Sequence, residues 1–168
     1  VILIGLMLFV TWNDISRLVR IGGYSTMAID AIGLPKTIDK DGPSGISGTL
    51  TGGKSCMAWP AEVVMASTWN NELIERVGVH IGEDSIASGT AGWYAPGVDI
   101  HRAPYSGRNF EYYSEDPFLS GIIAASVTKG VQSKPGCGVT IKHFACNNQE
   151  DNRMGVDVCV SERALREI

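Results

Sequence analysis

The sequence predicts an α/β fold in which parallel strands alternate with helices, and three observations support this prediction. Strand-like segments at 34–39, 92–100 and 139–145 alternate with three helical segments, as in successive βα units. The length of 168 residues allows a sizeable core but is short of the about 250 residues of a complete (β/α)8 barrel. The composition, 44% hydrophobic and 19% charged, is that of an ordinary globular domain.

The first predicted strand, 34–39, runs into a turn signal made of Asp41, Gly42 and Pro43. Glycine and proline at this point break any continuation of regular structure. The segment 44–53 that follows is rich in glycine, serine and threonine. We therefore expect an exposed loop at the carboxyl end of this strand.

The first predicted helix spans about 70–86, and either Thr68 or Asn70 is available as its N-cap. Its apolar stripe has the spacing i, i+4, i+8 and consists of Leu73, Val77 and Ile81. One stripe predicts one buried face. We interpret Trp69 as a residue that packs at the helix start and His80 as a core or rim histidine.

A second helix is predicted from Asp116, its N-cap, and Pro117 at the first helical position. It runs to residue 131, and its inward face is expected to consist of Leu119, Ile122, Ile123, Val127 and Val131. The third strand, 139–145, is followed by a final helix that Ser161 caps and whose apolar face carries Leu165 and Ile168. Because the chain ends inside this helix, we expect it to be part of a longer domain.

Charge and cysteine spacing exclude several classes of function. A formal net charge of −4 argues against a nucleic-acid partner, because phosphate neutralisation needs a basic surface. The cysteines show no metal-binding spacing, so we expect no metal or cofactor, and mostly reduced thiols with a disulfide as the minority case: Cys56, Cys137, Cys146 and Cys159. The absence of an Asn-x-Ser/Thr sequon favours a cytoplasmic over a secreted protein.

The N-terminal residues 1–19 form a lead-in of uncertain role. They open with the apolar run VILIGLMLFV, which is too short to span a bilayer, so no membrane association is predicted. No basic region precedes this run and no cleavage site follows it. We expect a buried first segment, with a truncated signal sequence as the alternative.

Polar side chains follow each of the three predicted strands. They are Asp41 with its turn, the segment 102–111, and the pair Lys142 and His143. Ligands of parallel α/β sheets bind at the carboxyl ends of the strands, where the loops and helix N-termini meet. Carboxylates accept hydrogen bonds from hydroxyl groups, whereas arginine and lysine donate charge-assisted ones. This combination predicts a pocket for a sugar.

Each of these residues also has a purely structural interpretation. Asp41 before Gly-Pro is often only a turn residue, and Arg102 and Arg108 are often ion-pair partners of nearby acids. Lys142 and His143 are harder to explain in this way, because a lysine inside an apolar strand needs a partner. Core and rim packing is the default for the aromatic residues, with stacking on a sugar as the alternative: Trp93, Tyr94, Tyr105, Tyr112 and Tyr113.

Four motifs together resemble the N-terminal barrel domain of glycoside hydrolase family 3. They are DGPSG at 41–45, STWNNEL at 67–73, YAPGVDIHRAPYSGRNFEYYSEDP at 94–117 and KHFACNNQEDNR at 142–153, followed by SERALREI. The resemblance covers roughly residues 20–168. It implies a partial TIM (β/α)8 barrel, comprising roughly the first three βα units with parallel strands.

The resemblance also implies roles for individual residues. Asp41, Arg108, Lys142 and His143 match residues that hold the hydroxyl groups of the sugar next to the cleaved bond. Glu111 matches a glutamate expected to orient Arg108 or Lys142. Less firmly assigned are two further motif arginines, either substrate contacts or supporting residues: Arg102 and Arg153.

The activity that the resemblance implies is retaining, exo-acting hydrolysis of terminal β-linked sugars. Such a reaction needs two carboxyl groups about 5–5.5 Å apart, one as nucleophile and one as acid/base. In the family the nucleophilic aspartate follows the SERALREI helix, and a second domain commonly supplies the acid/base glutamate. We therefore expect this chain to bind a small β-glucoside or β-xyloside without the reacting carboxylates, which belong to the missing remainder of the barrel and a second domain.

One difference from part of the family indicates which of its branches the sequence resembles. After Lys-His-Phe the bacterial N-acetylglucosaminidases carry a Gly-His-Gly loop with a catalytic histidine, whereas this sequence reads ACNNQEDNR. That difference favours the β-glucosidase and β-xylosidase branch. Two alternatives remain at this point: an inactive α/β scaffold that binds sugar weakly or not at all, and a Schiff-base enzyme with Lys142 as nucleophile.

Overall fold

The computed structural model describes residues 11, 12, 14, 23–47 and 56–168. The predicted lead-in 1–19 and the loop 44–53 therefore lie largely outside the described residues. The elements, in chain order, are β1 Ser25–Thr26, η1 Asp30–Ile32, β2 Thr37–Asp41, α3 Glu62–Ala66, α4 Asn71–Ala87, β3 Gly92–Tyr94, η2 Asn109–Glu111, α5 Pro117–Val131, β4 Gly138–Val139, η3 Arg153–Gly155 and α6 Glu162–Glu167. In this part of the chain no helix has both the length and the apolar character needed to cross a membrane.

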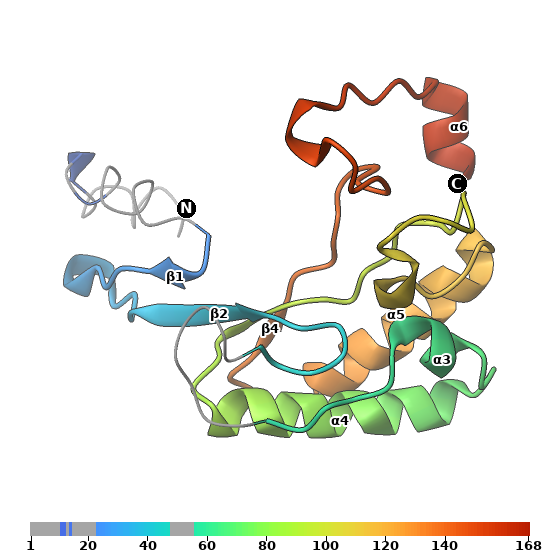
Figure 1. Cartoon of the computed structure of the whole chain (residues 1–168). Helices are drawn as coiled ribbons and strands as arrows, with labels where there is room; N and C mark the ends of the chain where they lie inside the picture. Colours follow the sequence, from blue (N-terminus) through green and yellow to red (C-terminus); the bar gives the residue numbers. More distant parts are fainter. Residues whose placement is uncertain (1–10, 13, 15–22, 48–55) are drawn as a thin grey trace.

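The strands form one sheet in the order β1-β2-β3-β4. β2, β3 and β4 are parallel neighbours, which confirms the predicted parallel arrangement. The short β1 was not predicted, and it pairs with β2 in the antiparallel sense. Figure 1 shows α4 and α5 side by side along one side of this sheet, while the chain after β4 leads away to α6.

The boundaries of β2 differ from the prediction of 34–39. β2 spans Thr37–Asp41, so it starts three residues later and reaches two residues further. Leu34 instead pairs with Ile29 across the turn around Gly33, whose φ is 67°. Pro35 follows, and it has no N–H to donate to a neighbouring strand. The later end places Asp41 inside the strand and at its carboxyl terminus.

The other two predicted strands, 92–100 and 139–145, are shorter than expected. β3 ends at Tyr94 and β4 at Val139. Pro96 interrupts the first ladder because proline cannot donate a ladder hydrogen bond. The two segments nevertheless continue side by side, since Gly97 forms a parallel bridge with Lys142.

Helices α4 and α5 confirm the two predicted helices to within one residue, and both N-caps are formed. The Asn70 side chain accepts from the Leu73 N–H at 2.9 Å, and the Asp116 side chain accepts from the Phe118 N–H at 2.9 Å. Such caps satisfy donors that have no partner inside the helix. Of the predicted inward face of α5, Ile123, Val127 and Val131 are buried and Leu119 and Ile122 half-buried.

The buried face of α4 matches the predicted stripe only in part. Ile81 is buried and Val77 packs against the core, but Leu73 is 40% exposed, and Ile74 and two glycines complete the buried face. The glycines allow α4 and α5 to approach closely: a Cβ on Gly78 would lie 2.4 Å from the Val127 carbonyl oxygen. Counting apolar side chains misplaced part of the face, because glycine contributes backbone contact and no hydrophobicity.

The interpretation of Trp69 was wrong, and those of His80 and the last helix were partly right. Trp69 is 74% exposed. The exposed His80 is not a core residue, but its ring stacks on Trp59 at the edge of the core and it pairs with Glu83. α6 begins after Ser161, whose hydroxyl accepts from the Ala164 N–H, as predicted. Its apolar side chains are solvent-accessible, with exposed fractions of 46% and 58% for Leu165 and Ile168.

Candidate functional site

Three segments that are distant in sequence meet at Lys142. Its Nζ donates to Asp41 Oδ1 at 2.7 Å and lies 2.9 Å from Glu111 Oε2. Asp41 ends β2, Glu111 ends η2, and Lys142 follows β4, so the carboxyl side of the sheet gathers all three. The Lys142 side chain is only 12% exposed, and it has the carboxylate partners that a buried cation requires.

Asp41 is positioned by the turn that follows it. Its Oδ1 accepts from the Gly42 N–H at 2.8 Å, and the Trp93 indole donates to the Gly42 carbonyl at 2.8 Å. Gly42 has a φ of 151°, and a Cβ there would lie 1.8 Å from the Gly45 carbonyl oxygen. Only glycine fits this position. Asp41 therefore serves the turn and the lysine at the same time.

Arg108 is held on three sides. Its Nε donates to Glu111 at 2.6 Å, one terminal nitrogen donates to Glu150 at 2.9 Å, and the other lies 2.6 Å from His143 Nε2. Burial raises the pKa of Glu111, but hydrogen bonds from Arg108 and Lys142 outweigh it and hold that pKa below its ordinary value. Glu111 is therefore an anion that contacts both cations of the site.

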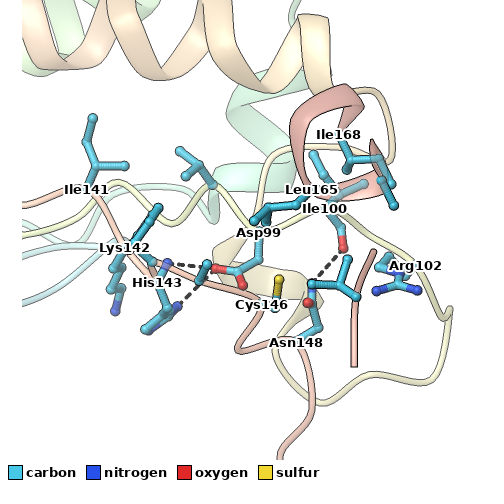
Figure 2. A pocket seen from close by; sticks show the side chains of 15 residues that line it. Asp99, Ile100, Arg102, Ile141, Lys142, His143, Cys146, Asn148, Leu165 and Ile168 are labelled. Carbon is cyan, nitrogen blue, oxygen red and sulfur yellow. Dashed lines mark hydrogen bonds and ion pairs between the residues drawn. The ribbon is translucent and has the colours of Figure 1, made fainter. Parts of the chain in front are cut away.

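His143 is fixed by two neighbours of different chemistry. Arg108 can only donate, so His143 Nε2 must accept, and the ring proton is assigned to Nδ1. Nδ1 lies 3.2 Å from Asp99 Oδ1, which also accepts from the His143 backbone N–H at 2.8 Å. Figure 2 shows both contacts as dashed lines from Asp99. This network gives the His143 ring a defined orientation.

A hollow of about 500 Å³ opens beside this cluster. Its lining consists of Tyr24, Asp39, Asp41, Tyr94, Arg108, Thr140, Lys142, His143 and Arg153. Five of the site residues predicted from the sequence therefore line one hollow: Asp41, Arg108, Lys142, His143 and Arg153. A sixth, Glu111, contacts this lining directly. Arg153 also lies 3.4 Å from Glu150, which holds Arg108.

Arg102 does not line the hollow that contains Asp41 and Arg108. It is exposed and lines two neighbouring hollows, one of which Lys142 and His143 also line. Figure 2 shows Arg102 near Asn148 and on the side of the adjacent hollow where Leu165 and Ile168 lie. Its side chain forms no ion pair with the residues that the structure describes. Its assignment as a substrate contact is not tested by this geometry.

Sequence reasoning missed four polar residues of the region. They are Asp99, Glu150, Asp39 and Glu62. Asp99 lies in the second predicted strand segment, and Glu150 lies in the polar run after Lys142 and His143. The position of each in a segment already singled out could have identified it. Glu62 carried none, because it stands in a short helix that was not predicted.

The five aromatic residues considered from the sequence differ in their burial. Trp93, Tyr112 and Tyr113 are core residues at 0–1% exposure, and Tyr105 is 97% exposed. Tyr94 alone of the five predicted aromatics lines the hollow, and its hydroxyl donates to the Gly23 carbonyl. Burial, and then the neighbouring Asp39, raise the pKa of Tyr94. Its neutral hydroxyl is one further polar group at the edge of the site.

The described residues contain no group of three or more histidine, cysteine, aspartate or glutamate side chains that could hold a metal ion. The side chains of the cluster around Lys142 offer hydrogen-bond donors and acceptors in a partly buried setting, which suits a ligand rich in hydroxyl groups.

Comparison with known proteins gives a consistent result. The family model described as "Glycosyl hydrolase family 3 N terminal domain" matches residues 2–168. The chain is 42% identical over 153 residues to thermostable beta-glucosidase B of Acetivibrio thermocellus, covering 86% of this chain and 20% of that protein. It is 46% identical over 146 residues to beta-glucosidase A of Butyrivibrio fibrisolvens, covering 87% and 17%.

Solved structures show the same similarity. Beta-glucosidase 3B from Thermotoga neapolitana, in complex with alpha-D-glucose, superposes with a TM-score of 0.86 at 43% identity, covering 98% of this chain and 26% of that chain. Beta-glucosidase from Kluyveromyces marxianus in complex with glucose gives 0.88 at 39% identity, covering 97% and 20%. The fold is thus the predicted α/β part of a TIM barrel. The chain spans about a fifth of the length of the curated relatives it matches.

Proposed function

Because the chain belongs to glycosyl hydrolase family 3, whose N-terminal domain it matches over residues 2–168, we propose that it is the sugar-holding part of a retaining, exo-acting β-glycosidase of the β-glucosidase type. Its substrate on this proposal is a small carbohydrate with a terminal β-linked glucose or xylose. The relatives are named beta-glucosidases, and two similar structures are described in complex with glucose. The observation that carries the proposal is the cluster around Lys142.

Unused hydrogen-bonding capacity remains in this cluster. The Lys142 ammonium has three N–H donors, and Asp41 and Glu111 take two of them. The Arg108 guanidinium has five, and its three contacts leave two. Asp41 Oδ2 remains as an acceptor beyond the bonds that Oδ1 makes. A ligand with several adjacent hydroxyl groups can donate a hydrogen bond to Asp41 Oδ2 and accept hydrogen bonds from Lys142 and Arg108.

The charge balance of the site favours a neutral ligand. Three cationic side chains line the hollow: Arg108, Lys142 and Arg153. Four carboxylates line it or bind these cations: Asp39, Asp41, Glu111 and Glu150. An anion such as a phosphate would compete with carboxylates already in place, whereas a neutral sugar leaves the ion pairs intact.

The carboxylates of this cluster are suited to binding and not to bond cleavage. A general acid needs a raised pKa and access to substrate, yet the pKa of Glu111 is lowered. Asp41 is committed to Lys142, and Glu150 to Arg108. We therefore assign both reacting carboxylates to other parts of the full-length protein. The cluster fixes the terminal sugar so that its anomeric carbon faces them.

The Schiff-base alternative does not suit this geometry. A lysine attacks a carbonyl group only through a free amine lone pair. Lys142 Nζ instead contacts two carboxylates, those of Asp41 at 2.7 Å and Glu111 at 2.9 Å. We expect borohydride to trap no adduct between the protein and carbonyl substrates.

The proposal is tested in the full-length polypeptide that contains this chain, with 4-nitrophenyl β-glucoside and β-xyloside as substrates. Lys142→Ala and Asp41→Ala each remove charge-assisted hydrogen bonds, so kcat/KM should fall about 10- to 100-fold or more. Lys129→Ala is the control, because Lys129 is an exposed α5 residue paired with Glu75. Its activity should equal that of the unmodified protein.

Two results would contradict the proposal. One is full activity of both cluster variants. The other is turnover of the same glycosides by the 168-residue chain alone, because that would show that the reacting carboxylates lie within it.

A further inference from the structure

A glutamate that plays no part in the proposed sugar contacts lies beneath the cluster. Glu62, the first residue of α3, is 0% exposed. Its Oε2 accepts from the Gly97 N–H at 2.9 Å, and its Oε1 is buried with no hydrogen-bond partner among the described residues. A fully buried carboxyl group is costly to the fold unless it has a task that offsets its burial.

Gly97 connects this glutamate to the cluster. It forms a parallel bridge with Lys142. The residues on both sides of Gly97 bond to the Lys142 backbone: the Val98 N–H donates to the Lys142 carbonyl at 2.8 Å, and the Pro96 carbonyl accepts from the Lys142 N–H at 3.1 Å. A Cβ at Gly97 would lie 2.3 Å from the Glu111 carbonyl oxygen. The backbone at Gly97 is thus in contact with the segments that carry both Lys142 and Glu111.

We propose that Glu62 is a positioning residue, which anchors the Gly97 amide and thereby holds Lys142 where its Nζ reaches both Asp41 and Glu111. The expected effect on sugar binding rests on the proposed function. The anchoring of the Gly97 amide by Glu62 concerns the protein without a ligand. Glu62 has no access to a substrate, so it acts only through the backbone segment that it binds.

The protonation state of Glu62 follows from its surroundings. Burial raises its pKa well above the ordinary value of 4.5, and the charge of Glu111 raises it further. The Gly97 hydrogen bond, the charge of Lys142 and the Tyr113 hydroxyl act in the opposite direction and do not compensate. Burial therefore favours the protonated, neutral form of Glu62, and glutamine is the nearest neutral replacement for that form.

The test compares Glu62→Gln with Glu62→Leu in the full-length polypeptide. Glutamine keeps an oxygen for the Gly97 amide, whereas leucine fills the space without an acceptor. We expect Glu62→Leu to raise KM and the inhibition constant of D-glucose about tenfold, and Glu62→Gln to change both by less than about twofold. Ile81→Ala is the matched control, because it removes core contacts on α4 remote from the cluster.

Amide hydrogen exchange at Gly97 gives a readout that requires no ligand. The Gly97 amide should be protected in the unmodified protein and in Glu62→Gln, and should lose protection in Glu62→Leu while remaining protected in Ile81→Ala. Glu62→Gln should also abolish the loss of stability on raising the pH above 4.5, because the folded state no longer retains an extra proton.

The outcomes separate the two proposals. If no glycoside is hydrolysed but the exchange pattern holds, the assigned activity is wrong and the anchoring role of Glu62 stands. If Glu62→Leu weakens glucose binding no more than Ile81→Ala does, or if Gly97 stays protected in it, Glu62 is not a positioning residue.

Discussion

Two glutamates whose pKa values are both influenced by Lys142 are shifted in opposite directions. Both are desolvated, which raises the pKa of each. Glu111 receives hydrogen bonds from Arg108 and Lys142, and these lower its pKa overall, whereas Glu62 receives one from a backbone amide. Desolvation therefore leaves the pKa lowered where two cations are in contact and raised where none is.

The ionised Glu111 should make the protein sensitive to acid. A lowered folded pKa means that its stabilising contribution is complete above the unfolded value of about 4.5 and is lost as the pH falls through the folded value. Glu111→Gln should cost about 3 kcal/mol or more at pH 7, because two buried cations lose a charged partner. Urea unfolding from pH 7 to 3 measures both effects.

The control for the Glu111 prediction is to compare Glu111→Gln with the unmodified protein at each pH. The difference in unfolding free energy between Glu111→Gln and the unmodified protein should shrink as the pH falls below 4.5. A difference that stays constant down to pH 3 would show that Glu111 is not held as an anion by Arg108 and Lys142.

At the scale of elements, the helices were predictable because their signals are local. Asn70, Asp116 and Ser161 each cap the helix that follows within three residues. Strand ends depend on partners far along the chain, so 92–100 and 139–145 were predicted as continuous where the ladder is interrupted. The ends of such short strands are set by backbone hydrogen bonds to neighbouring strands, and the amino-acid composition of a segment does not specify these bonds.

The contact between α4 and α5 should depend on glycine. A Cβ on Gly130 would lie 2.1 Å from the Glu75 carbonyl oxygen, so Gly130→Ala has to force the helices apart. We expect it to destabilise the protein by about 1–3 kcal/mol, as overpacking commonly does. Thermal and urea unfolding measure the change.

Gly121 on the same helix provides the matched control, since nothing lies within 4 Å of a Cβ added there. Gly121→Ala should stabilise α5 by about 0.5–1 kcal/mol, because alanine loses less backbone freedom in a helix. Equal effects of the two substitutions would refute the close-packing explanation.

At the scale of the whole molecule, the site was predictable where polar residues end strands. Asp41, Lys142 and His143 stand in the sequence beside apolar segments, and the parallel sheet brings them together. Asp99 and Glu62 were not found, because their partners lie 44 and 35 residues away and a buried carboxyl group leaves no pattern in sequence. The sequence thus pointed to most of the side chains that the structure brings together, including Glu111, but it did not point to Asp39 in the hollow or to Asp99 and Glu62 beside it.

The 168-residue chain alone should associate with itself. Four large apolar side chains border one hollow of about 220 Å³ and are 46–100% exposed: Ile141, Phe144, Leu165 and Ile168. Exposed apolar patches of this kind commonly mark surfaces that other protein covers. Light scattering should show oligomers or aggregates of the chain at micromolar concentration.

Replacing Phe144, which is 100% exposed, by serine should reduce this association without unfolding the core. A monodisperse monomer with a single cooperative melt would contradict the prediction. The scaffold alternative raised by the sequence is distinguished from the glycosidase proposal by activity of the full-length protein and not by this measurement.

The ion pair between Lys142 and Asp41 closes a loop of 101 residues, and this has a consequence during synthesis. At about 5–20 residues per second, a ribosome needs on the order of 5 to 20 seconds to make the intervening chain. For that interval Asp41 is present on the nascent chain without the lysine that will hold it. The hollow that Asp41 and Lys142 line can therefore be completed only after β2, β3 and β4 have all been made, late in the synthesis of this chain.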